Sequence, residues 1–159
     1  RHITGEIARE IGIEHLRAAA VIIPRVLGQT GIESSEIILS ICREIKPAAV
    51  IVVDALACSE PKHLGKTIQL STGGISPGSG VQNRRAEISQ STLGVPVIAI
   101  GIPTVADAEH EGTEEPLMVT PRDIDTLIHR SARILAASIN KALQPMLSIS
   151  DILMLTIES

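Results

Sequence analysis

The sequence contains no phenylalanine, tyrosine or tryptophan, although it is 159 residues long and 44% hydrophobic. Aliphatic side chains must therefore fill the core without the large aromatic residues that usually anchor one. No apolar run reaches the roughly 18 residues that a membrane-spanning helix needs, so no membrane association is predicted. Two cysteines, Cys42 and Cys58, are too few for a disulfide framework and indicate a reduced, cytoplasmic protein.

Positive charge is also scarce, since 14 basic residues face 18 acidic ones and the net charge is −4. Nucleic-acid binders usually carry a basic face, so no nucleic-acid partner is predicted. None of the five histidines stands at a metal-ligand spacing from another histidine, a cysteine or an acid. The sequence therefore predicts neither a metal site nor a cofactor. The acidic run at residues 106–116 is expected to be an exposed loop.

Hydrophobic periodicity predicts alternating helices and strands. Ser34 or Ser35 is expected to cap a helix that ends at Lys46-Pro47, and Thr120 is expected to cap a helix that runs to about Leu143. The remaining expected elements are a short helix in residues 4–16, strands at residues 18–23, 48–53, 67–70 and 95–100, and a last short helix from Ser150-Asp151 through Thr156.

This order of elements predicts one α/β domain over residues 1–159, with helices on both faces of a central sheet. The run at residues 48–53 is apolar throughout and mostly β-branched. Such a strand is typical of a parallel sheet that is buried on both faces. The predicted fold is therefore a three-layer αβα arrangement with a mostly parallel sheet.

Two aspartates follow the predicted strands at the edge of the sheet where active groups of α/β proteins lie. Asp54 follows the strand at residues 48–53, and Asp107 follows the strand at residues 95–100 by a short segment. A carboxylate is costly to bury unless it is used or neutralised, which makes Asp54 the first candidate for chemistry. The alternative is that Asp54 caps the turn after its strand.

A glycine-rich loop at residues 73–81 also follows a predicted strand. Backbone N–H groups in such a loop can approach an anion or a peptide closely. The loop matches neither the P-loop nor the dinucleotide-binding fingerprint, and a structural turn is the alternative.

Several blocks together resemble the spore germination proteases, and they are collinear over about residues 17–143. They include Val-Leu-Gly-Gln-Thr-Gly at residues 26–31, Val-Val-Asp-Ala-Leu-Ala at 52–57, Pro-Gly-Ser-Gly-Val at 77–81 and Pro-Val-Ile-Ala-Ile-Gly at 96–101. Two positions depart from the family pattern, since Thr72 stands where the family commonly has aspartate and Ser76 where it commonly has histidine.

The resemblance implies an endopeptidase of atypical aspartic type that degrades small acid-soluble spore proteins in the spore core during germination. It also implies a fold related to the hydrogenase-maturation proteases, a zymogen and a homotetramer. Asp54 matches one of the two catalytic aspartates of that family. Gly78, Ser79, Gly80 and Asp107 are the candidate substrate-binding residues.

The second catalytic aspartate of the family lies in an Asn-x-Thr-Pro-Asp block, and no such block occurs in this sequence. The chain begins at Arg1 without an initiator methionine, so we expect an incomplete chain that lacks that aspartate. Two alternatives stay open at this stage. One is a catalytically inactive structural or assembly domain with the same fold, and the other is a module that binds a small ligand or metal through Asp54 and the glycine-rich loop.

Overall fold

A computed structural model describes residue 12 and residues 16–24, 27–78, 85–108 and 117–157 of the chain. These residues form two compact units. One unit comprises residues 24–128, and the other comprises residues 1–23 together with residues 129–159. The helix expected at residues 4–16 lies almost wholly outside the described residues.

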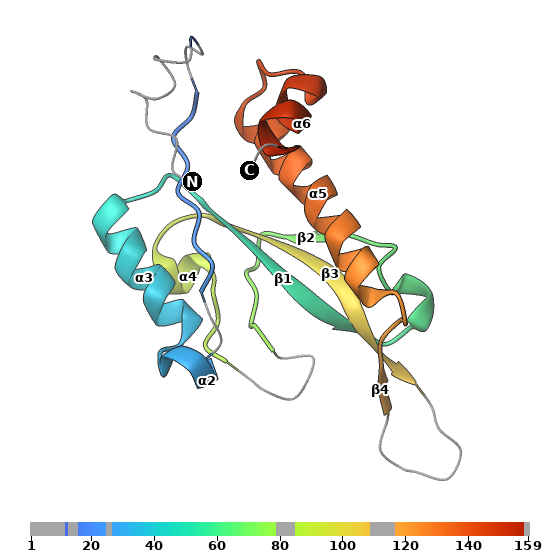
Figure 1. Cartoon of the computed structure of the whole chain (residues 1–159). Coiled ribbons are helices and arrows are strands. Elements are labelled where there is room, and N and C mark those ends of the chain that lie inside the picture. Colours follow the sequence, from blue (N-terminus) through green and yellow to red (C-terminus); the bar gives the residue numbers. More distant parts are fainter. Residues whose placement is uncertain (1–11, 13–15, 25–26, 79–84, 109–116, 158–159) are drawn as a thin grey trace. The chain divides into compact units, whose positions relative to one another are not determined.

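The unit of residues 24–128 is built on a four-stranded sheet (Figure 1). Strands β1 (Val50–Cys58) and β3 (Val97–Ala108) are parallel. Strands β2 (Gln69–Ser71) and β4 (Leu117–Val119) both pair with β3 in the antiparallel sense. The α/β class is thus confirmed, but the sheet is mixed and the prediction of a mostly parallel sheet was wrong. Only residues 109–116 join β3 to β4, which is too short for the crossover that a parallel pair requires.

The two long strands extend well beyond their predicted ends. β1 continues through Asp54 to Cys58, and β3 continues through Gly101 to Ala108. The register pairs Asp54 with Gly101 and shifts between Leu56 and Ala57, which leaves Thr104 as the extra residue of a bulge. Asp54 does not end β1 and Gly101 does not end β3, because the backbone ladder between the two strands continues past both residues. Residues 106–108 therefore belong to β3 rather than to an acidic loop.

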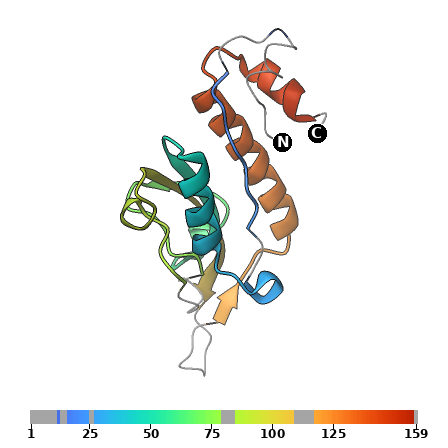
Figure 2. The same ribbon diagram turned by 90° about the vertical axis from the view of Figure 1, so that its left-hand side faces the viewer.

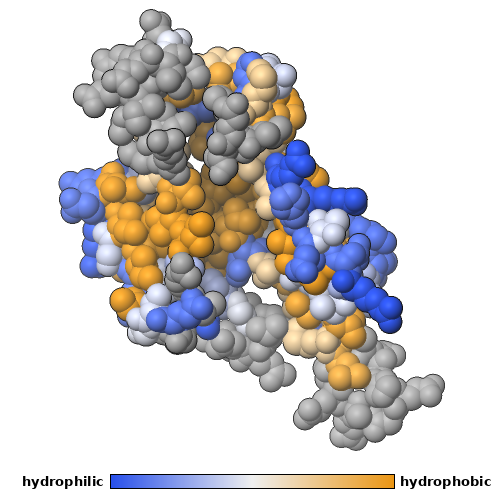
Figure 3. Space-filling view, in the orientation of Figure 1, coloured by the Kyte–Doolittle hydropathy of each residue, from blue (hydrophilic) through white to orange (hydrophobic). Residues whose placement is uncertain are grey.

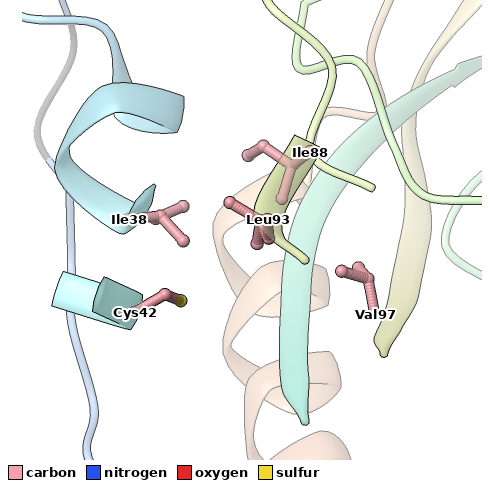
Figure 4. Close-up of a cluster of buried hydrophobic side chains, with 5 residues drawn as sticks. All are labelled: Ile38, Cys42, Ile88, Leu93 and Val97. Atoms are coloured by element: carbon pink, nitrogen blue, oxygen red, sulfur yellow. The ribbon is translucent and has the colours of Figure 1, made fainter. Parts of the chain in front are cut away.

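Two helices cover one face of this sheet. Helix α3 (Ser34–Ile45) and the short helix α4 (Gln90–Leu93) bring their apolar side chains onto it. Figure 4 shows these side chains pointing toward one another between α3, α4 and the strands. The cluster consists of Ile38, Cys42, Ile88, Leu93 and Val97, with Val50 and Val52 packed against it. Helical spacing in α3 and strand alternation in β1 and β3 explain why these residues share a side.

The ends of α3 differ in how well they were predicted. Glu33 is the N-cap residue, not Ser34 or Ser35, and its side chain makes no capping hydrogen bond. The predicted end is confirmed: Lys46 is the C-cap in a left-handed conformation, with a φ of 46°, and its N–H donates to the Cys42 carbonyl. Pro47 then prevents the helix from continuing.

The opposite face of the sheet keeps several apolar side chains exposed. Val53, Leu70 and Ile98 share this face by register and remain 49%, 71% and 37% exposed. Figure 3, in the orientation of Figure 1, shows a broad area of apolar surface in orange. The same unit contains α2 (Leu27–Thr30) and a 3-10 helix, η1 (Pro61–His63).

Helix α5 (Ile124–Leu143) starts in this unit and continues into the other, and Figure 2 shows it as one unbroken helix. Its end at Leu143 agrees with the prediction. Its start does not, because the Thr120 hydroxyl donates to the Thr104 carbonyl at 2.8 Å instead of capping the helix. Residues 121–123 form a turn before the first helical residue.

The unit that contains both chain ends holds the last helix, α6 (Ile149–Ile157). Ser148 precedes it, and its hydroxyl accepts from the Asp151 N–H while its own backbone N–H donates to the Asp151 carboxylate. This is the reciprocal pattern of a capping box. Among the described helices, none is both long and apolar enough to cross a bilayer.

The strand predicted at residues 18–23 is not assigned as a strand. This segment falls in the unit of the chain ends, whereas the sheet falls in the other unit. Buried Gln144 binds its start: the Arg17 N–H donates to Oε1 at 2.9 Å, and Nε2 donates to the Arg17 carbonyl at 2.8 Å. A β-branched run predicts an extended backbone, but local propensity alone does not make a sheet strand.

Candidate active site

Asp54 lies in the middle of β1, with four strand residues on each side. The interpretation that it caps a turn is therefore wrong. Its side chain is half-buried, and its carboxylate accepts a hydrogen bond from the Ala55 N–H. Burial raises the pKa of Asp54 above its ordinary value, because the charged form loses hydration, and the Ala55 N–H offsets part of this rise. Asp54 therefore holds its proton more tightly than an exposed aspartate.

Gly101 stands directly across the ladder from Asp54. A Cβ built on Gly101 would lie 2.1 Å from Leu56 Cδ1 and 2.5 Å from Leu56 Cγ. The Leu56 side chain thus occupies the space above Gly101 that another side chain would fill. Because side chains alternate along a strand, Leu56 and Asp54 point to the same face of β1, the face that packs on α3.

Asp107 lies near the far end of β3, where it pairs with Met118 of β4. It is six residues beyond Gly101, the partner of Asp54. At about 3.3 Å per strand residue, this is a separation of about 20 Å. The structure therefore does not bring the two aspartates together, contrary to the expectation that they share one edge. The reason is that both strands are longer than predicted.

The glycine-rich loop is described only as far as Gly78, so the candidates Ser79 and Gly80 lie outside the described residues. Gly74 has a φ of 90°, and a Cβ there would lie 2.6 Å from the Ile88 carbonyl oxygen. Next to it, Ile75 and Ile88 exchange two backbone hydrogen bonds of 3.0 and 2.8 Å. This part of the loop is held by an isolated antiparallel bridge between Ile75 and Ile88. The binding role of Gly78, Ser79 and Gly80 stays a prediction.

Both cysteines are free, as the sequence predicts. Cys42 is buried in the core cluster, and burial raises its pKa, so it is an unreactive thiol. The Cys58 thiol donates to the Glu60 carbonyl at 3.3 Å. In the described part of the chain, no group of three or more histidine, cysteine, aspartate or glutamate side chains could hold a metal.

A shallow cavity of about 190 Å³ lies on the helical side of the sheet unit. Its walls come from the start of α3, the segment before Ile88, and α4: Ser35, Glu36, Leu39, Ala86, Glu87, Thr92 and Leu93. Asp54 does not line it. The cavity therefore adds nothing to the site around Asp54.

Leu56 and Gly101 were not among the candidates from the sequence. A glycine inside a strand that is otherwise apolar is a signal for close approach by another group, and Gly101 has that context in β3. The contact with Leu56 could not be foreseen, because it depends on the register between β1 and β3.

Comparison of the sequence with known proteins relates the chain to a class of peptidases. The sequence model described as germination protease matches residues 1–115. A germination protease of Clostridium tetani is 38% identical over 195 aligned positions, which cover 96% of this chain and 60% of that protein. Germination proteases of Halalkalibacterium halodurans and Priestia megaterium are 51% and 49% identical over 108 positions, which cover 68% of this chain and 29% of each relative.

The chain belongs to the germination protease family. It spans about 60% of the length of the clostridial relatives that match most of it.

Proposed function

We propose that this chain forms part of an endopeptidase of atypical aspartic type that acts in spore germination, with Asp54 as a catalytic carboxyl group. The observation that carries the proposal is the half-buried Asp54 in the middle of β1, whose pKa is raised by burial. Perturbed carboxyl groups cluster at catalytic sites. Membership of the germination protease family supplies the reaction class.

Peptide hydrolysis of the aspartic type needs two carboxyl groups in different protonation states. The ionised group takes a proton from the water that attacks the scissile carbonyl, and the protonated group donates to the developing oxyanion and then to the leaving amine. A raised pKa suits Asp54 to the second role, because it keeps the proton available at higher pH.

The finer features of the proposal rest on the family resemblance. The substrates are small acid-soluble spore proteins in the spore core, and the enzyme is made as a zymogen and assembles as a homotetramer. The fold is a single three-layer αβα domain related to the hydrogenase-maturation proteases. Backbone N–H groups at Gly78, Ser79 and Gly80 and the side chain of Asp107 contact the peptide. The second catalytic carboxyl is the family's upstream aspartate.

One observation favours a second candidate function. Asp107 is about 20 Å from Asp54 along β3, so it cannot act as the partner carboxyl. A single carboxyl cannot hold both protonation states at once. The alternative is therefore a catalytically inactive structural or assembly domain with the same fold.

The test is incubation of the chain, joined to the family's upstream Asn-x-Thr-Pro-Asp block, with a small acid-soluble spore protein, beside the variants Asp54→Asn and Asp107→Asn of the same protein. Fragments are followed by mass spectrometry. The proposal expects cleavage that falls about 10²–10⁴-fold in Asp54→Asn, which is the usual effect of losing a general acid or base. It expects Asp107→Asn to keep the catalytic step and to change only the binding of the peptide.

Equal cleavage by the original chain and Asp54→Asn would contradict the catalytic role of Asp54. Absence of cleavage by any of the three proteins would favour the inactive domain.

A further inference from the structure

We propose that Leu56 is a positioning residue for Asp54: held over Gly101, it forms an apolar wall that keeps water away from the Asp54 carboxyl group. Its meaning for catalysis rests on the proposed function, but its physical effect on the carboxyl group does not. The inference concerns three residues of one ladder, namely Asp54, Leu56 and Gly101.

The position of the Leu56 side chain follows from the contacts of Gly101. A Cβ on Gly101 would lie 2.1, 2.5 and 3.1 Å from Cδ1, Cγ and Cδ2 of Leu56, so the whole end of the leucine side chain covers this glycine. Gly101 is the ladder partner of Asp54, and neighbouring strands lie about 4.8 Å apart. The Leu56 side chain is therefore directed back along β1, toward the side chain of Asp54.

The absence of a side chain at Gly101 is what makes this arrangement possible. Any larger residue there would push Leu56 away and would itself stand beside Asp54. The φ of Gly101 is not positive, so its backbone conformation does not require glycine. Space for Leu56 accounts for glycine at this position.

Within the described part of the chain, no charged side chain is among the causes of the raised pKa of Asp54, so an apolar wall is enough to account for it. Burial and the Ala55 N–H are the two influences on its pKa. On the same face, α3 contributes Cys42, which burial keeps in its neutral form. The 3-10 helix η1 contacts β3 and carries Lys62 and His63, and neither is a cause of the shift. Removing apolar cover is therefore the direct way to change the proton affinity of Asp54.

The experiment is a pH titration of the Asp54 carboxyl carbon by NMR in the full chain and in variants. Leu56→Ala is expected to move the titration midpoint to lower pH, toward the ordinary value. Leu56→Met keeps an apolar side chain of similar volume and is expected to keep the midpoint near that of the original chain. Val53→Ala is the matched control, since Val53 is the neighbour of Asp54 but points to the opposite face of β1.

Gly101→Ala provides an independent variant, because its methyl group forces Leu56 from its place and so moves the midpoint in the same direction as Leu56→Ala. An unchanged midpoint in both variants would overturn the proposal, and so would an equal shift in Val53→Ala. If Gly101→Ala fails to fold, the comparison of Leu56→Ala with Leu56→Met and Val53→Ala decides the test alone.

The cleavage assay separates this inference from the proposed function. A chain without peptidase activity whose Asp54 midpoint still responds to Leu56→Ala would refute the function and keep the positioning role. In an active enzyme, the limb of the pH–rate profile that reports Asp54 is expected to shift by the same amount as the NMR midpoint.

Discussion

At the scale of single residues, the proposed function gives Asp54 a catalytic role that comes with a cost in stability. A half-buried carboxyl group is unfavourable in its ionised form, because the protein replaces its hydration only in part. The single hydrogen bond from the Ala55 N–H does not cancel this effect, since the pKa remains raised. Replacing a functional group of this kind with an inert residue commonly raises the stability of the protein.

Replacing Asp54 with asparagine is therefore expected to raise the free energy of unfolding at neutral pH. A raised pKa in the folded state means that Asp54 stabilises the fold fully below its ordinary pKa of 3.8, and this contribution is lost as the pH rises through the higher folded value. Asparagine has the same shape and stays neutral, so the pH dependence over that window should flatten. Urea unfolding at a series of pH values measures both effects.

Asp107→Asn is the control for this prediction, because Asp107 is exposed at the end of β3. Its stability should follow that of the original chain at every pH. A lower stability of Asp54→Asn at neutral pH would show that the ionised carboxyl group is satisfied in the fold.

Gly74 is a residue for which both the backbone and the surroundings require glycine. Its φ is 90°, and a Cβ would meet the Ile88 carbonyl oxygen at 2.6 Å and Ser89 Cβ at 2.6 Å. Gly74→Ala is expected to lower the free energy of unfolding by about 2–4 kcal/mol, from backbone strain and from displacement of the Ile75–Ile88 pair. The midpoint of urea unfolding gives the value.

Gly94→Ala separates the two causes. Gly94 also has a positive φ, 73°, but no atom lies within 4 Å of a Cβ built on it. This control should lose only about 1 kcal/mol, the cost of the left-handed conformation. Equal losses in the two variants would mean that the contact with Ile88 relaxes freely.

At the scale of elements, α3 is held on the sheet by the few large side chains that a chain without aromatic residues provides. Ile38 is buried between α3, α4 and the strands, whereas Ile45 on the same helix is 50% exposed. Ile38→Ala should lower the free energy of unfolding by about 2–4 kcal/mol, because it removes buried methyl groups and leaves a cavity. Ile45→Ala should cost about 0.5 kcal/mol or less.

Chemical denaturation of the two variants tests this difference. Similar losses for Ile38→Ala and Ile45→Ala would indicate that α3 does not pack on the sheet as described.

The sequence predicted the existence of elements better than their ends. The apolar residues at positions 37, 38, 41, 42 and 45 predicted α3, and Lys46-Pro47 predicted its end, because both signals are local. The ends of β1 and β3 depend on pairing between strands that are far apart in the sequence. The sequence therefore predicts strands that end before Asp54 and Gly101, although the ladder continues through both residues. Residues 18–23 show the converse, since their local β propensity predicted a strand and none is assigned there.

At the scale of the whole molecule, the α/β class followed from the alternation of helical and strand periods. The direction of the strands did not, because β2 and β4 are three residues each and their orientation is set by how the chain returns to β3. The candidate site shows the same limit. Asp54 was found from its place beside an apolar run, whereas the separation of Asp107 and the contact of Leu56 with Gly101 follow from the register alone.

This chain spans only part of the length of the clostridial relatives that match most of it. The alignment with the Clostridium tetani protein uses 96% of this chain but only 60% of that protein. A catalytic role for Asp54 therefore has to be judged on the chemistry of its own carboxyl group, rather than on the activity of longer relatives.

The most direct measurement of the central claim is the titration of the Asp54 carboxyl group in the unaltered chain, followed by NMR of the carboxyl carbon. Our account predicts a midpoint clearly above the ordinary value of 3.8, because burial in the middle of β1 favours the protonated acid. A midpoint at or below 3.8 would mean that Asp54 is well solvated or paired with a positive charge. It would contradict the proposal that Asp54 holds the proton that the aspartic mechanism needs.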